Sequence, residues 1–224
     1  VKSAYNNGEV VTLTATPFSP NTFHGWTGAA NTQSNPLSLT MNSHKTVRPV
    51  FTSLPPPPGL VGWWRGQGNA LDAMGTNHGT AVSGASYAEG KVGQGFVFDG
   101  VNDHIFIPDA PALRPESITL EAWASFNVPS GPIISRAYGT GTENSYMIYL
   151  GGGELWGFVR DAGGGYGFLR SGFFPVLGQW YHLGFTYDNI TTLISLYIDG
   201  VRVATGGFGG AIGYDDHPVL LGGD

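Results

Sequence analysis

The sequence predicts an all-β protein, with a small β-rich module followed by a larger antiparallel β-sandwich. Apolar and polar residues alternate in short runs, such as 96–98, 105–107 and 118–123, and this period of two is typical of half-buried strands. Turn-forming residues separate the runs, and the 224 residues include 36 Gly and 15 Pro. Because 41% of the residues are hydrophobic, the chain can form a core, so this Gly and Pro content indicates turns rather than disorder.

Composition excludes several classes of function. The net charge of −6 argues against a nucleic-acid partner, which needs a basic surface to neutralise phosphates. The absence of Cys rules out disulfides, cysteine zinc sites and thiol catalysis. No apolar run is long enough to cross a bilayer, so no membrane insertion is expected.

Residues 1–53 contain strand patterns that predict a small β module. The run Val10–Thr16 is rich in β-branched residues and is followed by Pro17, and residues 37–41 and 46–51 predict further strands. The segment resembles the divergent internalin-type B repeat of bacterial surface proteins, which implies an extracellular spacer without a catalytic role. The motifs that carry the resemblance are Tyr5, Gly8, VTLTATP (11–17), FHGWTG (23–28), NPLSLTM (35–41) and KTVRPVF (45–51).

A proline-rich linker is predicted over residues 54–59. Its four consecutive prolines, 55–58, favour a polyproline II rod that separates two modules. Such a segment can also be a ligand for an aromatic groove, but its position between two composition patterns favours the spacer.

Residues 60–224 carry the sandwich pattern. Leu183, Phe185 and Tyr187 alternate with polar residues, and Asp199-Gly200 is a strong hairpin signal. The aromatic residues Trp63, Trp123 and Trp180 are expected to pack in the core or at its edge. The segment resembles a laminin-G-like, concanavalin-type jelly roll, which implies two antiparallel sheets packed face to face in a mostly non-catalytic module. The resemblance rests on GLVGWWRGQGNALDAMGTNHGT (59–80), GKVGQGFVFDGVNDHIFIPD (90–109), SITLEAW (117–123), GQWYHLGFTYD (178–188) and LYIDGVRVATG (196–206).

The resemblance also implies one strand more than the sequence contains. A jelly roll of this family closes with a strand after the segment 220–224, so the domain is expected to lack its last strand. Either the residues are an excerpt of a longer chain, or a strand of another subunit completes the sheet.

Catalysis is not expected. A glycosidase needs two carboxylates that face each other across the scissile bond. Glu121 is the lone acid on its predicted strand, and the other acids nearby are isolated along the sequence: Glu143, Glu154, Asp161 and Asp188.

One loop is a candidate calcium site. The segment 72–79 resembles an Asp-x-x-Gly-x-x-x-Gly loop that helps to hold calcium in some relatives, and its first candidate ligands are Asp72 and Asn77. Asp and Asn also shape turns through hydrogen bonds to their own backbone, so each position has a structural alternative.

An aromatic strand is the candidate ligand site. If Leu155 and Val159 face the core, Trp156 and Phe158 face outward, and Tyr166 lies nearby after a Gly-rich hairpin. Exposed rings stack on sugars or form the centre of a protein contact. The alternative is that the strand has the opposite phase, or that the sheet is covered on both faces.

These features together predict a non-catalytic extracellular binding or adhesion module of a bacterial multi-domain surface or secreted protein. Its expected partner is a glycan or an extracellular matrix protein. The alternative is a structural subunit of an extracellular filament, in which neighbouring copies of the chain complete one another's sheets by strand exchange.

Overall fold

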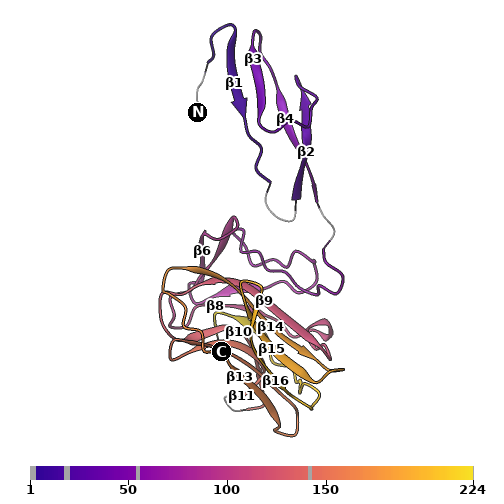
Figure 1. Cartoon of the computed structure of the whole chain (residues 1–224), viewed down its shortest axis with the longest axis vertical. Helices are drawn as coiled ribbons and strands as arrows, with labels where there is room; N and C mark the ends of the chain where they lie inside the picture. Colours follow the sequence, from indigo (N-terminus) through magenta and orange to yellow (C-terminus); the bar gives the residue numbers. More distant parts are fainter. Residues whose placement is uncertain (1–3, 18–20, 54–55, 141–142, 224) are drawn as a thin grey trace. The chain divides into compact units, whose positions relative to one another are not determined.

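The computed structural model describes residues 4–17, 21–53, 56–140 and 143–223. The chain divides into two compact units, Val1–Leu60 and Val61–Asp224 (Figure 1). Val1 to Ser3 and the linker residues Leu54 and Pro55 lie outside the described part. Within that part, no helix has the length and apolar character needed to cross a membrane.

The first unit consists of two β-ribbons with a small shared core. Strand β1 (Glu9–Leu13) pairs with β3 (Leu37–Met41), and β2 (Asn21–Gly28) pairs with β4 (Val47–Ser53), both antiparallel. Trp26 is buried between them with Ala15 and Leu37, and its indole Nε1 donates a hydrogen bond to the Ser34 carbonyl at 2.9 Å. Two of the predicted strands, 37–41 and 46–51, are therefore confirmed, and the third ends at Leu13, before Pro17.

The second unit is a sandwich of a seven-stranded and a four-stranded sheet (Figure 1). The seven-stranded sheet has the order β13-β12-β11-β10-β17-β8-β5, and all its pairs are antiparallel. Its strands are β5 (Thr80–Val82), β8 (His104–Ile107), β10 (Gly131–Tyr138), β11 (Glu143–Gly151), β12 (Glu154–Arg160), β13 (Tyr166–Arg170) and β17 (Val219–Leu221).

The four-stranded sheet has the order β16-β15-β14-β9. Its strands are β9 (Ile118–Ser125), β14 (Trp180–Asp188), β15 (Leu193–Ile198) and β16 (Val201–Gly207). Asp199 and Gly200 both have positive φ (50° and 79°) in the turn between β15 and β16, so the hairpin predicted there is confirmed. A separate hairpin joins β6 (Ser86–Glu89) to β7 (Gln94–Val97), and the short 3-10 helix η1 spans Pro111–Leu113.

The carboxyl-terminal strand β17 lies inside the seven-stranded sheet. Val219 pairs with Arg136 of β10 on one side and with Ile107 of β8 on the other. Strand β17 is thus hydrogen-bonded to a neighbouring strand on each side. The expectation of one further strand after Asp224 stays a prediction.

The core fills the space between the two sheets, and at one point the sheets come very close. Leu183, Phe185 and Leu196 of the four-stranded sheet are fully buried, and Phe185 and Leu196 face β12. A Cβ at Gly157 would lie 2.5 Å from the Phe185 ring and 3.0 Å from Leu196 Cδ2. Only a residue without a side chain fits at this position of β12.

We expect Gly157→Ala to lower the free energy of unfolding by about 1–3 kcal/mol, because the added methyl overpacks the core. Denaturant unfolding followed by tryptophan fluorescence measures this loss. Gly207→Ala is the matched control, since a Cβ at that strand position meets nothing within 4 Å. Equal stability of the two variants would contradict the close contact.

Candidate functional site

The outer face of the seven-stranded sheet carries a group of aromatic side chains on β11, β12 and β13. Leu155 and Val159 are fully buried in the core, and the residues between them, Trp156 and Phe158, point away from it. The outward orientation that the sequence predicted for Trp156 and Phe158 is therefore what the structure has. We call the following residues the aromatic band: Tyr149, Trp156, Phe158, Tyr166 and Phe168.

Strand register brings these rings into contact. Trp156 pairs with Tyr149 of β11, and their ring centroids are 5.8 Å apart. The Trp156 ring also meets Phe168 edge to face at 5.5 Å, and Phe158 stacks on Tyr166 at 5.9 Å. Tyr166 is 67% exposed and Phe168 is 41% exposed, so the band presents ring surface to solvent.

The Trp156 ring lies directly on the backbone of the neighbouring strand. A Cβ at Gly151 would come within 2.3 Å of the indole, so the ring can occupy this position only because residue 151 is glycine. The Arg170 guanidinium lies 5.5 Å from the centre of the same ring. Trp156 is thus partly buried and held between the backbone and a cation.

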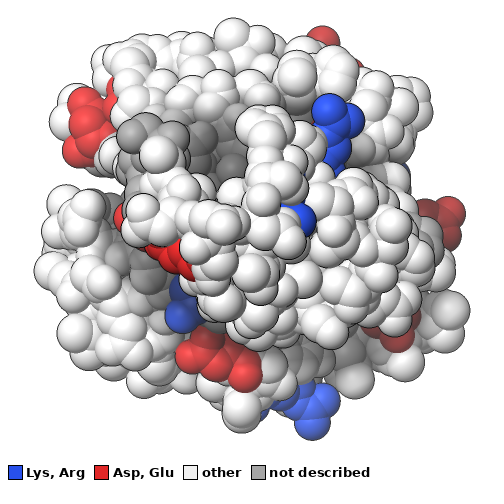
Figure 2. Space-filling model, turned by 90° about the horizontal axis from the view of Figure 1, so that it is seen from above, with Lys and Arg blue, Asp and Glu red and all other residues white. Residues whose placement is uncertain are grey.

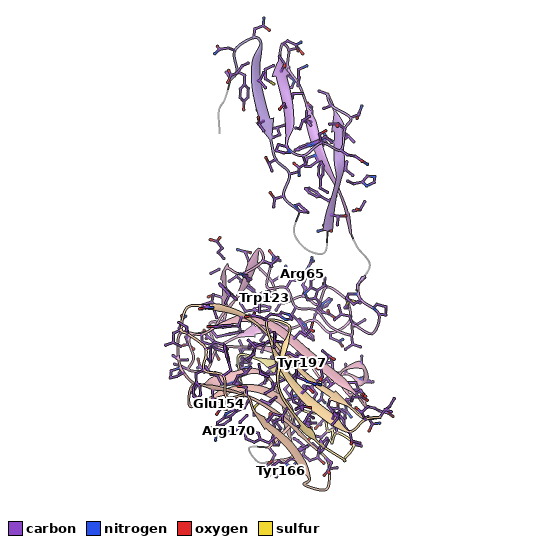
Figure 3. The ribbon with its side chains drawn as sticks, viewed as in Figure 1. Arg65, Trp123, Glu154, Tyr166, Arg170 and Tyr197 are labelled. Atoms are coloured by element: carbon purple, nitrogen blue, oxygen red, sulfur yellow. The ribbon has the colours of Figure 1, made fainter. Side chains whose placement is uncertain are left out.

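The charged groups at the band are paired with one another. Glu154 accepts a 2.7 Å hydrogen bond from Arg170 Nε and a 2.8 Å bond from the Gly172 amide, and these hold the pKa of Glu154 below its usual value. Arg160 forms a 3.0 Å ion pair with Glu143 and lies over the Tyr138 ring. Figure 3 shows Glu154 beside Arg170. The band therefore exposes rings but little uncompensated charge.

Sequence reasoning missed Tyr149 and Arg170 as neighbours of Trp156. Their proximity depends on cross-strand register, and single-strand alternation contains no information about register. Two neighbouring phenylalanines have different environments. Phe173 packs edge to face on the buried Tyr181, whereas Phe174 is 61% exposed.

The loop that begins at Asp72 is organised by the carboxylate of that residue, which is 3% exposed. Its oxygens accept hydrogen bonds from the backbone amides of Trp63 (2.7 Å), Met74 (2.9 Å), Asn77 (3.0 Å) and Thr76 (3.4 Å). Burial alone would raise the pKa of Asp72, but the amides outweigh it and the pKa lies below its usual value.

Asn77 is also buried and takes part in the same loop. Its Nδ2 donates to the Val61 carbonyl at 2.9 Å, and its own carbonyl accepts from the indole of Trp64 at 2.7 Å. These contacts give Asp72 and Asn77 a structural role in closing the loop. The calcium site at this loop stays a prediction.

A second charged cluster joins three segments at one end of the sandwich. Arg136 of β10 is fully buried and contacts Asp109, 2.5 Å away, and the Asp215 carbonyl at 2.8 Å. Asp109 also binds Arg114, and the hydrogen bonds from Arg114 and then Arg136 lower the pKa of Asp109 to about 2. The network ties the loop after β8 and the loop before β17 to β10.

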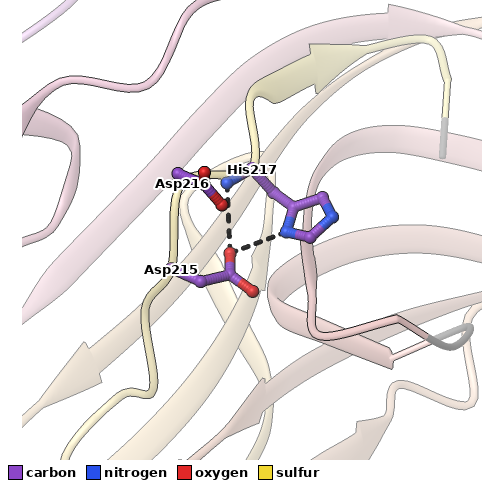
Figure 4. A group of neighbouring side chains, drawn as sticks. All are labelled: Asp215, Asp216 and His217. Carbon is purple, nitrogen blue, oxygen red and sulfur yellow. Dashed lines mark hydrogen bonds and ion pairs between the residues drawn. The ribbon is translucent and has the colours of Figure 1, made fainter.

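The residues Asp215, Asp216 and His217 are the one group of potential metal ligands among the described residues (Figure 4). Asp215 already accepts hydrogen bonds from the Gly139 amide at 2.6 Å and from His217 Nδ1 at 2.8 Å. No pattern in the sequence singles out this group. The hydrogen bond between Asp215 and the Gly139 amide anchors this loop to the turn after β10.

Two family models match the chain and together cover most of it. Residues 99–224 match the model described as the concanavalin A-like lectin/glucanases superfamily, which is of laminin-G type. The chain belongs to this superfamily. Residues 1–55 match the divergent InlB B-repeat domain, so the concanavalin A-like unit follows a B repeat, as the sequence motifs predicted. None of the curated proteins matches the chain.

Solved structures share the fold at low sequence identity. The binding domain of Paraclostridial Mosquitocidal Protein 1 has a TM-score of 0.57 and 14% identity over 67% of this chain and 41% of that one. Domain 4 of AbnA, a GH43 extracellular arabinanase from Geobacillus stearothermophilus in complex with arabinotriose, has a TM-score of 0.53 and 21% identity over 70% and 79%. The receptor binding domain of botulinum neurotoxin D has a TM-score of 0.52 and 16% identity over 68% and 41%. The match thus spans about two fifths of the toxin chains.

We expect Asp72→Asn to lower the free energy of unfolding by about 1.5–3 kcal/mol, because buried amides lose a charged acceptor. Thermal unfolding with and without calcium provides the measurement. A calcium-dependent rise in wild-type Tm that the variant lacks would support the predicted calcium site. If Asp72→Asn is as stable as the wild type, the structural role of the carboxylate is contradicted.

The lowered pKa of Asp109 also predicts acid sensitivity. A carboxyl whose pKa is depressed on folding contributes stability above its usual pKa of 3.8, and that stability is lost as the pH falls towards about 2. The loss amounts to about 2 kcal/mol for this group.

Denaturant unfolding between neutral pH and pH 2 tests the Asp109 prediction. Asp109→Asn should be less stable at neutral pH, because it leaves the buried Arg136 unpaired, and its stability should fall less on acidification. Asp216→Asn is the control at an exposed acid of the neighbouring loop. An unaltered pH profile in Asp109→Asn would reject the assignment.

Proposed function

We propose that this chain is a non-catalytic binding module of an extracellular bacterial surface or secreted protein, and that the aromatic band binds glycan. The observation that carries the proposal is the band itself: contiguous, partly exposed rings on one sheet face. A sugar ring has apolar C–H faces that stack on aromatic side chains, while its hydroxyl groups remain in water or form hydrogen bonds.

The charge arrangement supports a neutral glycan. Arg170 and Arg160 are each compensated by a glutamate, so an anionic sugar gains little attraction at the band. The whole chain has few charges, at 12% of residues, and the view in Figure 2 shows acidic and basic groups scattered among uncharged ones. A neutral polysaccharide therefore suits this surface better than a charged one.

Four of the five acids considered for catalysis have structural roles in the fold. Glu143 and Glu154 pair with arginines, Asp161 accepts from the Gly163 and Gly165 amides, and Asp188 accepts from the Ile190 amide. Carboxylates engaged in this way are poorly placed to act as an acid and nucleophile pair. This supports a binding role without catalysis.

The similar structures also support a binding role, since two are named as toxin binding domains and one contains arabinotriose. The B repeat and the prolines after it, Pro56 to Pro58, suit a spacer that carries the binding unit away from a surface.

We expect Tyr166→Ala and Trp156→Ala to weaken binding to neutral polysaccharides by about tenfold each, which corresponds to about 1.4 kcal/mol. Affinity electrophoresis in arabinan, xylan and galactan gels measures the change. Tyr166 is mostly exposed, so its variant should fold normally, and Trp156→Phe should retain part of the affinity.

Ile190→Ala is the control for this experiment, because its side chain is 91% exposed on a turn far along the chain from the band. Unchanged binding of both aromatic variants would reject the band as the binding surface. If instead the wild-type chain forms concentration-dependent oligomers that Trp156→Ala dissolves, the band is a contact between copies and the glycan proposal fails.

A further inference from the structure

A second group of rings lies on the outer face of the other sheet. In β9, Leu120 and Ala122 face the core, and Trp123 and Glu121 point away from it. Trp123 is 45% exposed and lies on the edge strand of its sheet, so of the two places expected for it, the core or its edge, it does not pack in the core. Trp180, which shares the outward phase of its strand with His182, is half-buried on the same face.

Register gathers the outward residues of three strands into one surface. Trp123 of β9 pairs with His182 of β14, and their ring centroids are 5.2 Å apart. Glu121 pairs with Gly184, which pairs with Tyr197 of β15. We call this surface the Trp123 face, and Figure 3 marks Trp123 and Tyr197 in it. Its residues are Lys91, Glu121, Trp123, Trp180, His182 and Tyr197.

A glycine on β14 makes room for a phenol on this face. A Cβ at Gly184 would lie 3.4 Å from Tyr197 Cβ and 3.8 Å from Tyr197 Cδ2, so the Tyr197 side chain lies against the backbone of Gly184, the residue that pairs with Glu121. At the other end of the surface, Lys91 Nζ lies 5.3 Å from the centre of the Trp123 ring. The Trp123 face thus combines aromatic rings with a carboxylate, an ammonium group and an imidazole.

The charges on this face differ from those at the aromatic band. Glu121 and Lys91 are both exposed, and neither forms an ion pair within the part of the chain that the structure describes. An anionic ligand would meet Glu121 and a cationic ligand would meet Lys91. A neutral polyhydroxylated ligand satisfies both, because a hydroxyl group donates to a carboxylate and accepts from an ammonium group.

We propose that the Trp123 face is a second binding site for neutral glycan, in which Trp123 stacks on a sugar ring and Glu121, Lys91 and His182 bind its hydroxyl groups. The inference shares the ligand class of the proposed function but uses a different surface.

The two sites lie on opposite faces of one sandwich, since the Trp123 face is on the four-stranded sheet and the aromatic band is on the seven-stranded sheet. The sheets of such a sandwich are about 10 Å apart, and the side chains of both outer faces point in opposite directions. One straight stretch of polysaccharide cannot contact both surfaces. The concanavalin A-like unit is therefore bivalent and links two glycan chains.

Affinity electrophoresis of the full chain in arabinan, xylan and galactan separates the two surfaces. We expect Trp123→Ala to weaken binding about tenfold and Glu121→Gln to weaken it several-fold, with Trp123→Phe retaining most of the affinity. Tyr166→Ala should keep residual binding, which Trp123→Ala then removes in the double variant. Val201→Ala on β16 is the control, since its side chain is 65% exposed outside the Trp123 face.

Cross-linking provides a second readout, because turbidity of a soluble arabinan solution needs two sites per molecule. Either single variant should abolish the turbidity while leaving binding measurable. Binding by Trp123→Ala equal to wild type, alone and in the Tyr166→Ala background, would overturn the second site. If Trp123→Ala weakens glycan binding while Tyr166→Ala and Trp156→Ala do not, the Trp123 face is supported as a binding site and the aromatic band is rejected as one. No retention of the wild type in any of the three gels would overturn both.

Discussion

The close approach of the two sheets at Gly157 is the contact on which the larger unit depends. Phe185 and Leu196 occupy the space that a side chain at position 157 would take, so the sheets pack without a gap. Once these strands are fixed, the alternation along each of them determines what remains outside. Both surfaces proposed to bind glycan consist of residues that this packing excludes from the core.

Most acids in the concanavalin A-like unit serve the fold. Asp72 closes a loop through backbone amides, and Asp109 compensates the buried Arg136. Glu154 fixes Arg170 beside Trp156. A buried charge without such partners would destabilise the fold, so these pairings are conditions of stability rather than signs of activity. Glu121 differs because it is exposed and without an ion-pair partner in the described chain.

The sequence predicted the sandwich and the orientation of Trp156 and Phe158, because strand alternation is a local property. The same alternation also predicts the outward orientation of Trp123, which shares its phase with Thr119 and Glu121. The hydrophobicity of tryptophan was instead the reason to expect Trp123 in the core or at its edge. The contacts of Trp156 with Arg170, and of Trp123 with Lys91, join separate segments and depend on register and loop conformation. No pattern within one strand specifies them.

The Trp156 indole rests on the backbone at Gly151, and this has a consequence for recognition. A side chain that is immobilised when the protein folds has little rotational freedom left to lose when a ligand arrives. The conformational entropy cost of association is correspondingly small, and the ring is preorganised in the free protein. In the proposed glycan site, affinity then reflects the fit of the sugar face rather than any rearrangement of the protein.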